Sequence, residues 1–299
     1  MNKGILYGLG AYALWGFFPI YWKFLHNVPA LQVIGHRIVW SFALLVGILL
    51  VTQQWNAFRL AALQPQVFGI YTIAAVLLTV NWLVYVWGVN AGFIVETSLG
   101  YFINPLLSVL LGVIFLRERL RPMQWLPVGI AAIGVFYLTA VYGRPPWIAL
   151  ALAFSFGFYG LVKKLAPLGS LYGLTLETGI AFPFALIYLL IVELNSTGAF
   201  VQEGTATTLL LIGAGAVTTI PLLMFASAAK QIPLTVVGLL QYIAPTLQFL
   251  IGVFLYKEPF DHSHLIGFGI VWVALVIFWV ENYFAHRLPV EPIPELGEG

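Results

Sequence analysis

Ten apolar runs, each about as long as a membrane-crossing helix, follow one another along this 299-residue chain. A helix needs about 20 apolar residues to cross a hydrocarbon core of roughly 30 Å. The runs cover residues 4–22, 31–52, 68–89, 97–116, 123–141, 147–163, 171–192, 207–229, 234–256 and 265–285. The sequence therefore predicts an all-α polytopic membrane protein with ten transmembrane helices and short connections.

The composition narrows the function classes. Charged residues make up 8% of the chain, whereas soluble domains carry roughly 25%. The net charge of +2 is spread thinly, so no nucleic-acid partner is expected. The chain has no cysteine, which excludes disulfides and thiolate chemistry. It also lacks a Walker-type loop, H-E-x-x-H, G-x-S-x-G and acidic pairs with metal-ligand spacing, so we expect no enzyme, nucleotide, metal or cofactor.

Lysines and arginines gather on one side of the predicted membrane. With a cytoplasmic N-terminus, nine lie inside and three outside. The inside residues are Lys3, Arg59, Arg117, Arg119, Arg121, Lys163, Lys164, Lys230 and Arg287, and the outside ones are Lys23, Arg144 and Lys257. This bias predicts that both termini are cytoplasmic, with 287–299 as a solvated tail. No cleavage site follows the first run, which suits a retained helix in an inner (plasma) membrane.

The chain matches itself at an offset of 140 residues. Residues 101–120 align with 241–260 without a gap, and ten of 32 positions are identical between 99–130 and 239–270. Pro105 and Pro245 are among the matched positions, as are Glu118 and Glu258. We expect these two carboxylates to tie their turns through backbone N–H groups or through the neighbouring basic residue. Each half holds five spans, and an odd number inverts the second half. We therefore predict two inverted five-helix repeats, 1–142 and 143–286.

The same features carry a family resemblance. Ten spans in two halves, each with a proline in its fourth helix and then "GVIFLRERL" or "GVFLYKEPF", resemble the EamA family of the drug/metabolite transporter superfamily. The stretches "YALWGFFPIYWK", "HRIVWS" and "LTLETGIAFP" are more narrowly similar to its RarD branch, the chloramphenicol-sensitivity proteins. The resemblance covers residues 4–285 and implies an inner-membrane exporter or carrier of small amphipathic metabolites or drugs. It does not fix one substrate.

Two charges interrupt matched helices of the two halves. Arg37 lies in the second run and Glu177 lies 140 residues later, in the seventh. An unpaired charge in the core costs about 3 kcal/mol or more, so each needs a partner or a hydrated cavity. We expect both at a substrate site. Separated by roughly 12 Å of depth, they could bracket a zwitterion. The alternative is that each charge bonds another residue and locks the helices.

Neighbouring groups extend this prediction. A buried carboxyl holds a proton more readily than an exposed one, so Glu177 is the candidate for proton coupling. His36 precedes Arg37 and could relay a proton, but a neutral imidazole bonded to a neighbouring helix is favoured.

Polar and aromatic side chains predict a cavity at the same level. Tyr101, Asn104 and Ser108 share one face of the fourth run, and Gln241, Pro245 and Gln248 share the corresponding face of the ninth. Pro105 and Pro245 are expected to kink their helices and free the carbonyls of Tyr101 and Gln241. Further candidates for contact with the substrate are Trp15, Asn81 and Tyr85, although aromatic residues at helical spacing are more often packing. Ordinary kinks and packing are the alternatives.

The expected function is a secondary transporter that moves small amphipathic molecules, amino-acid-like or amphenicol-like, by alternating access. Without a nucleotide site, the energy must come from a gradient of the substrate or of protons. A passive facilitator or channel is the main alternative, and an intramembrane enzyme is a weaker one because its reacting groups are missing. The partners expected are a small-molecule substrate, the lipid bilayer and protons as a coupling ion.

Overall fold

A computed structural model describes residues 2–91, 93–143, 145–257 and 262–285. In these residues every regular element is a helix. The helices are α1 (Lys3–Gly16), α2 (Phe18–Lys23), α3 (Ala30–Val51), α4 (Trp55–Ala62), α5 (Pro65–Asn90), α6 (Ile94–Phe115), η1 (Pro122–Gln124), α7 (Trp125–Tyr142), α8 (Trp147–Leu165), α9 (Ser170–Leu194), α10 (Thr205–Gln231), α11 (Leu234–Leu240), α12 (Ile243–Leu250), η2 (Ile251–Leu255, a π-helix) and α13 (His262–Ala285). The predicted all-helical membrane architecture is confirmed.

The spans lie where the apolar runs predicted them. Nine helical segments of the described chain are long and apolar enough to cross a membrane, with α1 and α2 forming one and α11 to η2 another. The tenth run corresponds to α13, whose apolar part, Leu265–Glu281, is shorter. This is a multi-pass membrane protein.

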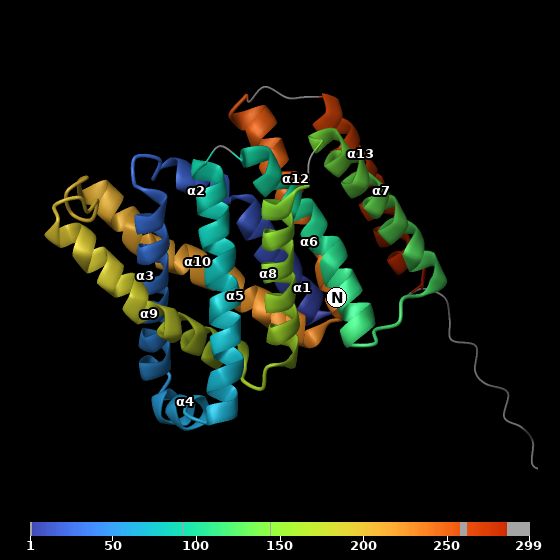
Figure 1. Ribbon diagram of the computed structural model, residues 1–299. Helices are drawn as coiled ribbons and strands as arrows, with labels where there is room; N and C mark the ends of the chain where they lie inside the picture. Colours follow the sequence, from blue (N-terminus) through green and yellow to red (C-terminus); the bar gives the residue numbers. More distant parts are fainter. Residues whose placement is uncertain (1, 92, 144, 258–261, 286–299) are drawn as a thin grey trace, which may run out of the picture.

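The helices pack side by side around α1, α6 and α8 (Figure 1). Helix α1 packs on α10 and α12, while α8 packs on α5 and α6. Helices α3 and α9 pack together at one edge, and α7 and α13 pack together at the other. Helices α2 and α4 lie at opposite ends of the layer (Figure 1), which we call the α2 end and the α4 end.

Proline breaks two of the spans. Helix α1 ends before Pro19, which has no N–H to donate to the Trp15 carbonyl four residues earlier. The Gln248 side chain replaces that donor, with Nε2 3.0 Å from the Trp15 oxygen. The ninth span is interrupted at Gln241, four residues before Pro245, and the Gln241 carbonyl accepts the Ala244 N–H instead. Pro105, by contrast, lies inside the uninterrupted helix α6.

A small residue brings α3 and α10 into close contact. A Cβ atom on Gly215 would lie 2.5 Å from the backbone carbonyl carbon of Trp40, so a larger residue would push the helices apart. At this contact Ser41 donates its hydroxyl to the Gly215 carbonyl at 3.0 Å. The close approach places Arg37, one turn earlier on α3, beside Thr218 of α10.

Glu118 joins the two halves at the α4 end. Its carboxylate accepts the backbone N–H groups of Leu234 and Thr235 at 2.7 and 2.9 Å, in the first turn of α11. A negative charge there also offsets the positive end of the helix dipole. Glu118 thus bonds backbone N–H groups, one of the two predicted alternatives, but these groups belong to the other half of the chain and not to its own turn. Glu258 lies outside the described residues.

Helix α4 falls in the connection between the second and third apolar runs, where no helix was predicted. It buries Phe58 and Ala62 against Leu49 of α3 and Tyr71 of α5, and leaves Leu60 exposed. The spacing of Trp55, Phe58 and Ala62 on one face was the available signal.

Candidate functional site

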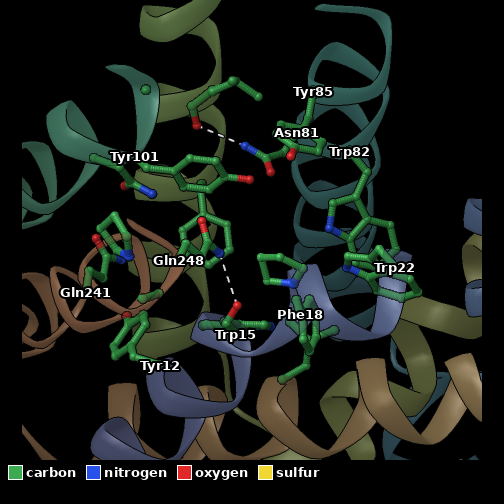
Figure 2. Close-up of a pocket in the computed structure, with 18 of the residues that line it drawn as sticks. Tyr12, Trp15, Phe18, Trp22, Asn81, Trp82, Tyr85, Tyr101, Gln241 and Gln248 are labelled. Carbon is green, nitrogen blue, oxygen red and sulfur yellow. Dashed lines mark hydrogen bonds between the residues drawn. The ribbon is translucent and has the colours of Figure 1, made fainter. Parts of the chain in front are cut away.

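A cavity of about 320 Å³ lies among α1, α2, α3, α5, α6, α8, α10 and the α11–α12 segment (Figure 2). It lies nearer the α2 end, because its lining includes residues of α2 and comes from the first three turns of α3, α6 and α8. Eight of the ten predicted substrate-site residues line it, and Pro245 lines it as well. These eight are Trp15, Arg37, Asn81, Tyr85, Tyr101, Asn104, Gln241 and Gln248. His36, Glu177 and Pro105 are not among the residues that line it.

Arg37 brings a positive charge to the cavity wall. Its guanidinium lies 4.4 Å from the Trp82 ring centroid and 5.0 Å from that of Trp22. Its Nε donates to the Thr218 hydroxyl at 2.9 Å. Within the described part of the chain, no carboxylate lies within ion-pair distance of Arg37. The remaining N–H groups of a guanidinium suit a carboxylate or phosphate, which they bind in a planar fork.

Two amide side chains in the cavity wall differ in their hydrogen bonds: that of Asn81 bonds α8, whereas the oxygen of Asn104 is unpaired among the described residues. Asn81 donates from Nδ2 to the Leu152 carbonyl and the Ser155 hydroxyl, both at 2.9 Å. The buried Oδ1 of Asn104, which lines the cavity, has no hydrogen-bond partner among the described residues. Buried polar atoms are normally paired, so this oxygen is available to accept a hydrogen bond from a ligand.

Aromatic rings form the rest of the wall and close the cavity toward the α4 end. Tyr85 and Tyr101 meet edge to face at 5.8 Å. On the α4 side, Trp15 packs against Phe156 at 5.9 Å. Phe225 then stacks on Tyr159, with ring centroids 5.9 Å apart and planes 13° apart. An apolar pocket with a few polar groups is what a small organic ligand requires.

Glu177 forms a buried ion pair on the α4 side of these aromatic rings. Lys163 Nζ lies 2.6 Å from its carboxylate, both side chains are 1% exposed, and the Tyr159 hydroxyl donates to the second oxygen at 3.1 Å. The structure thus gives Glu177 a partner near the end of α8 and separates it from the cavity that holds Arg37. This geometry corresponds to the alternative in which a charge locks helices, and it offers no bracket for a zwitterion.

The ion pair also changes the role of Lys163. The sequence interpretation counted Lys163 among the cytoplasmic loop residues, but it lies buried in α8. It therefore drops out of the loop cations on which the predicted orientation rests.

His36 is buried beside the cavity and does not form the expected hydrogen bond. Neither ring nitrogen has a hydrogen-bond partner in the part of the chain that the structure describes, and the ring stacks on Phe200 at 5.0 Å with 25° between the planes. The expectation of an imidazole bonded to a neighbouring helix was wrong. Phe200 belongs to the connection between α9 and α10, and nothing in the sequence pattern marked it.

A second cavity, of about 360 Å³, lies between α3, α5 and α9. Its lining is almost entirely apolar and includes Phe184, Thr79 and Tyr188 but no charged side chain. It offers few groups that could orient a polar ligand, so the cavity at Arg37 is the candidate site.

The model of the EamA-like transporter family matches residues 2–140 and again residues 145–280. The chain belongs to this family. The uncharacterized transporter YojE of Bacillus subtilis is 47% identical over 282 residues and is aligned over 93% of each chain. Protein RarD of Escherichia coli K12 is 42% identical over 286 residues, 96% of this chain and 97% of its own. This chain is thus a membrane transporter of the EamA-like family.

More distant relatives extend these similarities. The chloramphenicol-sensitive protein RarD of Pseudomonas aeruginosa is 29% identical over 283 residues, which is 92% of this chain and 93% of its own. A solved crystal structure superposes with a TM-score of 0.71 at 19% identity, covering 96% of this chain and 99% of the other. The superposition shows that the two chains share a fold.

Proposed function

We propose that this EamA-like transporter is a secondary carrier of small amphipathic molecules, amino-acid-like or amphenicol-like, which it moves across the inner membrane by alternating access. The observation that carries the proposal is the cavity at Arg37, closed toward the α4 end by aromatic rings and by the Lys163–Glu177 pair. A carrier needs a site that faces one side of the membrane at a time. The chloramphenicol-sensitive relative supports the amphenicol class.

The carrier is proposed to consist of two inverted five-helix repeats, residues 1–142 and 143–286, followed by a cytoplasmic tail. Support comes from the two family-model matches and from the helix contacts. If the halves are exchanged, the contact of α1 with α10 becomes that of α8 with α5, and the contact of α1 with α12 becomes that of α8 with α6. Inverted repeats of this kind alternate access by rocking around a central site. With both termini cytoplasmic, the cavity faces the outside.

The proposal includes coupling of transport to protons through Glu177. Opening the α4 end requires Lys163 and Glu177 to separate, which leaves two buried charges. A proton on Glu177 removes one of them and makes the separation less costly. We expect Glu177→Gln to abolish the effect of an imposed pH gradient on uptake into proteoliposomes, with Glu203→Gln on an exposed loop as the control. An unchanged response to the gradient would remove Glu177 from the coupling.

Counterflow tests the carrier against the facilitator or channel. Proteoliposomes are loaded with unlabelled phenylalanine or chloramphenicol, and entry of the labelled compound is followed over time. A carrier is expected to saturate and to give a transient overshoot, because each return step brings substrate back across the membrane. Flux that rises linearly with concentration and shows no overshoot would establish a channel instead.

A further inference from the structure

The two halves place different charges at corresponding positions. Lys23 and Lys163 are 140 residues apart, and so are Arg37 and Glu177. In the second half this pair of positions holds opposite charges in contact at 2.6 Å. In the first half the same two positions hold two cations. The two halves are therefore not equivalent at the place where each end of the cavity closes.

Neither cation of the first half is neutralised by a carboxylate in the described part of the chain. Lys23 is exposed and its Nζ lies 3.5 Å from the centroid of the Tyr256 ring. Arg37 rests on the Trp22 ring, in the residue next to Lys23, and faces the cavity. Among the described residues, these two cations at the α2 end are separated and have no carboxylate partner, whereas the α4 end is closed around an ion pair.

The next step rests on the proposed function. When an inverted-repeat carrier changes state, each half takes up the arrangement that the other half had. Closing the α2 end would then bring Lys23 and Arg37 to the contact that Lys163 and Glu177 make now. Two like charges brought that close repel each other strongly where little water screens them. Closure of the empty carrier is opposed, and an anion between the two cations removes the opposition.

We infer that the α2 end closes only around a small aromatic anion, whose carboxylate binds between Arg37 and Lys23. Arg37 is the one charged side chain among the described residues that line the cavity, and none of them is acidic. An ammonium group therefore finds no carboxylate there, because Glu177 is bound to Lys163. This requirement narrows the substrates of the proposed function. A monoanion is favoured over an amino-acid zwitterion, and a neutral amphenicol would not allow the α2 end to close. A cavity of about 320 Å³ suits a ligand built on one aromatic ring.

An obligatory exchange of anions follows from this inference. A carrier that has released its anion at the α2 end cannot close until it binds another. Net flux without a counter-substrate is therefore expected to be slow compared with exchange.

A single reporter thiol tests the closure directly, because the chain has no cysteine of its own. Ala244 lines the cavity and is small, so Ala244→Cys introduces a thiol with little change in volume. Its rate of reaction with a membrane-impermeant thiol reagent is measured in spheroplasts, where the reagent reaches the outer face. Phenylacetate is expected to slow labelling about tenfold, a typical strength of coupling between a ligand and a conformational change. Neutral phenylacetamide is expected to have no effect, and phenylalanine is expected to protect less than phenylacetate.

Charge reversal supplies the decisive variants, each made in the Ala244→Cys background. Arg37→Glu and Lys23→Glu each recreate in the first half the opposite charges of the Lys163–Glu177 pair. Both are expected to slow labelling about tenfold without any ligand, because the α2 end then closes on its own ion pair. Lys23 is exposed, so Lys23→Glu keeps the test available if Arg37→Glu fails to fold. Arg59→Glu, on the exposed face of α4, is the matched control and is expected to label like the parent.

The outcomes separate this inference from the carrier proposal. Equal protection by phenylacetamide and phenylacetate, or parental labelling of both charge-reversed variants, overturns the anion requirement. Counterflow in the Ala244→Cys parent, tested with phenylacetate, phenylalanine and chloramphenicol, still reports whether the protein is a carrier. Normal counterflow together with charge-independent labelling identifies a carrier that closes without an anion. Absence of counterflow with all three compounds overturns the proposed function itself.

Discussion

Replacing Lys163 by methionine is expected to lower the free energy of unfolding by about 3 to 5 kcal/mol, the usual cost of removing one partner from a buried ion pair. The loss is large because the Glu177 side chain is 1% exposed, so without Lys163 it must either keep an unpaired buried charge or take up a proton, and both cost free energy. The Tyr159 hydroxyl alone, at 3.1 Å, cannot compensate for that charge. The measurement is the unfolding of purified protein in detergent, followed by heat or denaturant.

The double variant Lys163→Met, Glu177→Leu distinguishes the loss of the pair from the loss of packing. Removing both charges leaves an apolar contact of similar volume, and such replacements are often neutral or stabilising. We expect the double variant to unfold close to the wild type and well above Lys163→Met. Lys3→Met, at an exposed position, is the control and is expected to change little. A double variant as unstable as the single one would show that the two side chains are not coupled.

The Lys163–Glu177 pair shows which features could be predicted from the sequence and which could not. Apolar runs of about 20 residues predict membrane helices reliably because lipid admits little else, and the observed helices begin and end near the predicted limits. Lys163, however, follows a long apolar run and looks like a loop cation. Only the tight turn between α8 and α9 reveals that it faces Glu177, 14 residues later in the chain.

The cavity was more predictable than the partners of its charges. Helical spacing put Tyr101 and Asn104 on one face of their span, and Gln241 and Gln248 on the corresponding face of the matched span. All four line the cavity. Contacts between distant helices leave no such trace. Arg37 bonds the hydroxyl of Thr218, which lies 181 residues later in the chain. This separation does not match the 140-residue offset of the repeat.

Replacing Arg37 by glutamine is expected to separate binding from stability. A hydrogen bond to a charged group contributes about 1.5 to 3 kcal/mol, so the affinity for phenylacetate is expected to fall roughly tenfold to a hundredfold. Chloramphenicol has no carboxylate, and its binding is expected to change much less. Both affinities are measured by calorimetry or by the ligand-induced shift of the unfolding temperature.

The stability of Arg37→Gln is expected to move the other way from that of Lys163→Met. Arg37 has no carboxylate partner in the described chain, and its charge within the membrane costs about 2.5 to 3.5 kcal/mol by insertion scales. Stacking on Trp22 and Trp82 offsets part of that cost. Without ligand, the variant is therefore expected to unfold at the wild-type temperature or above it. If the variant unfolds at a lower temperature while phenylacetate binds as before, Arg37 holds helices together and other groups of the cavity bind the ligand. If Arg37→Gln is as stable as the wild type but no longer binds phenylacetate, the positive charge does not stabilise the ligand-free protein. Its role is then to bind the ligand.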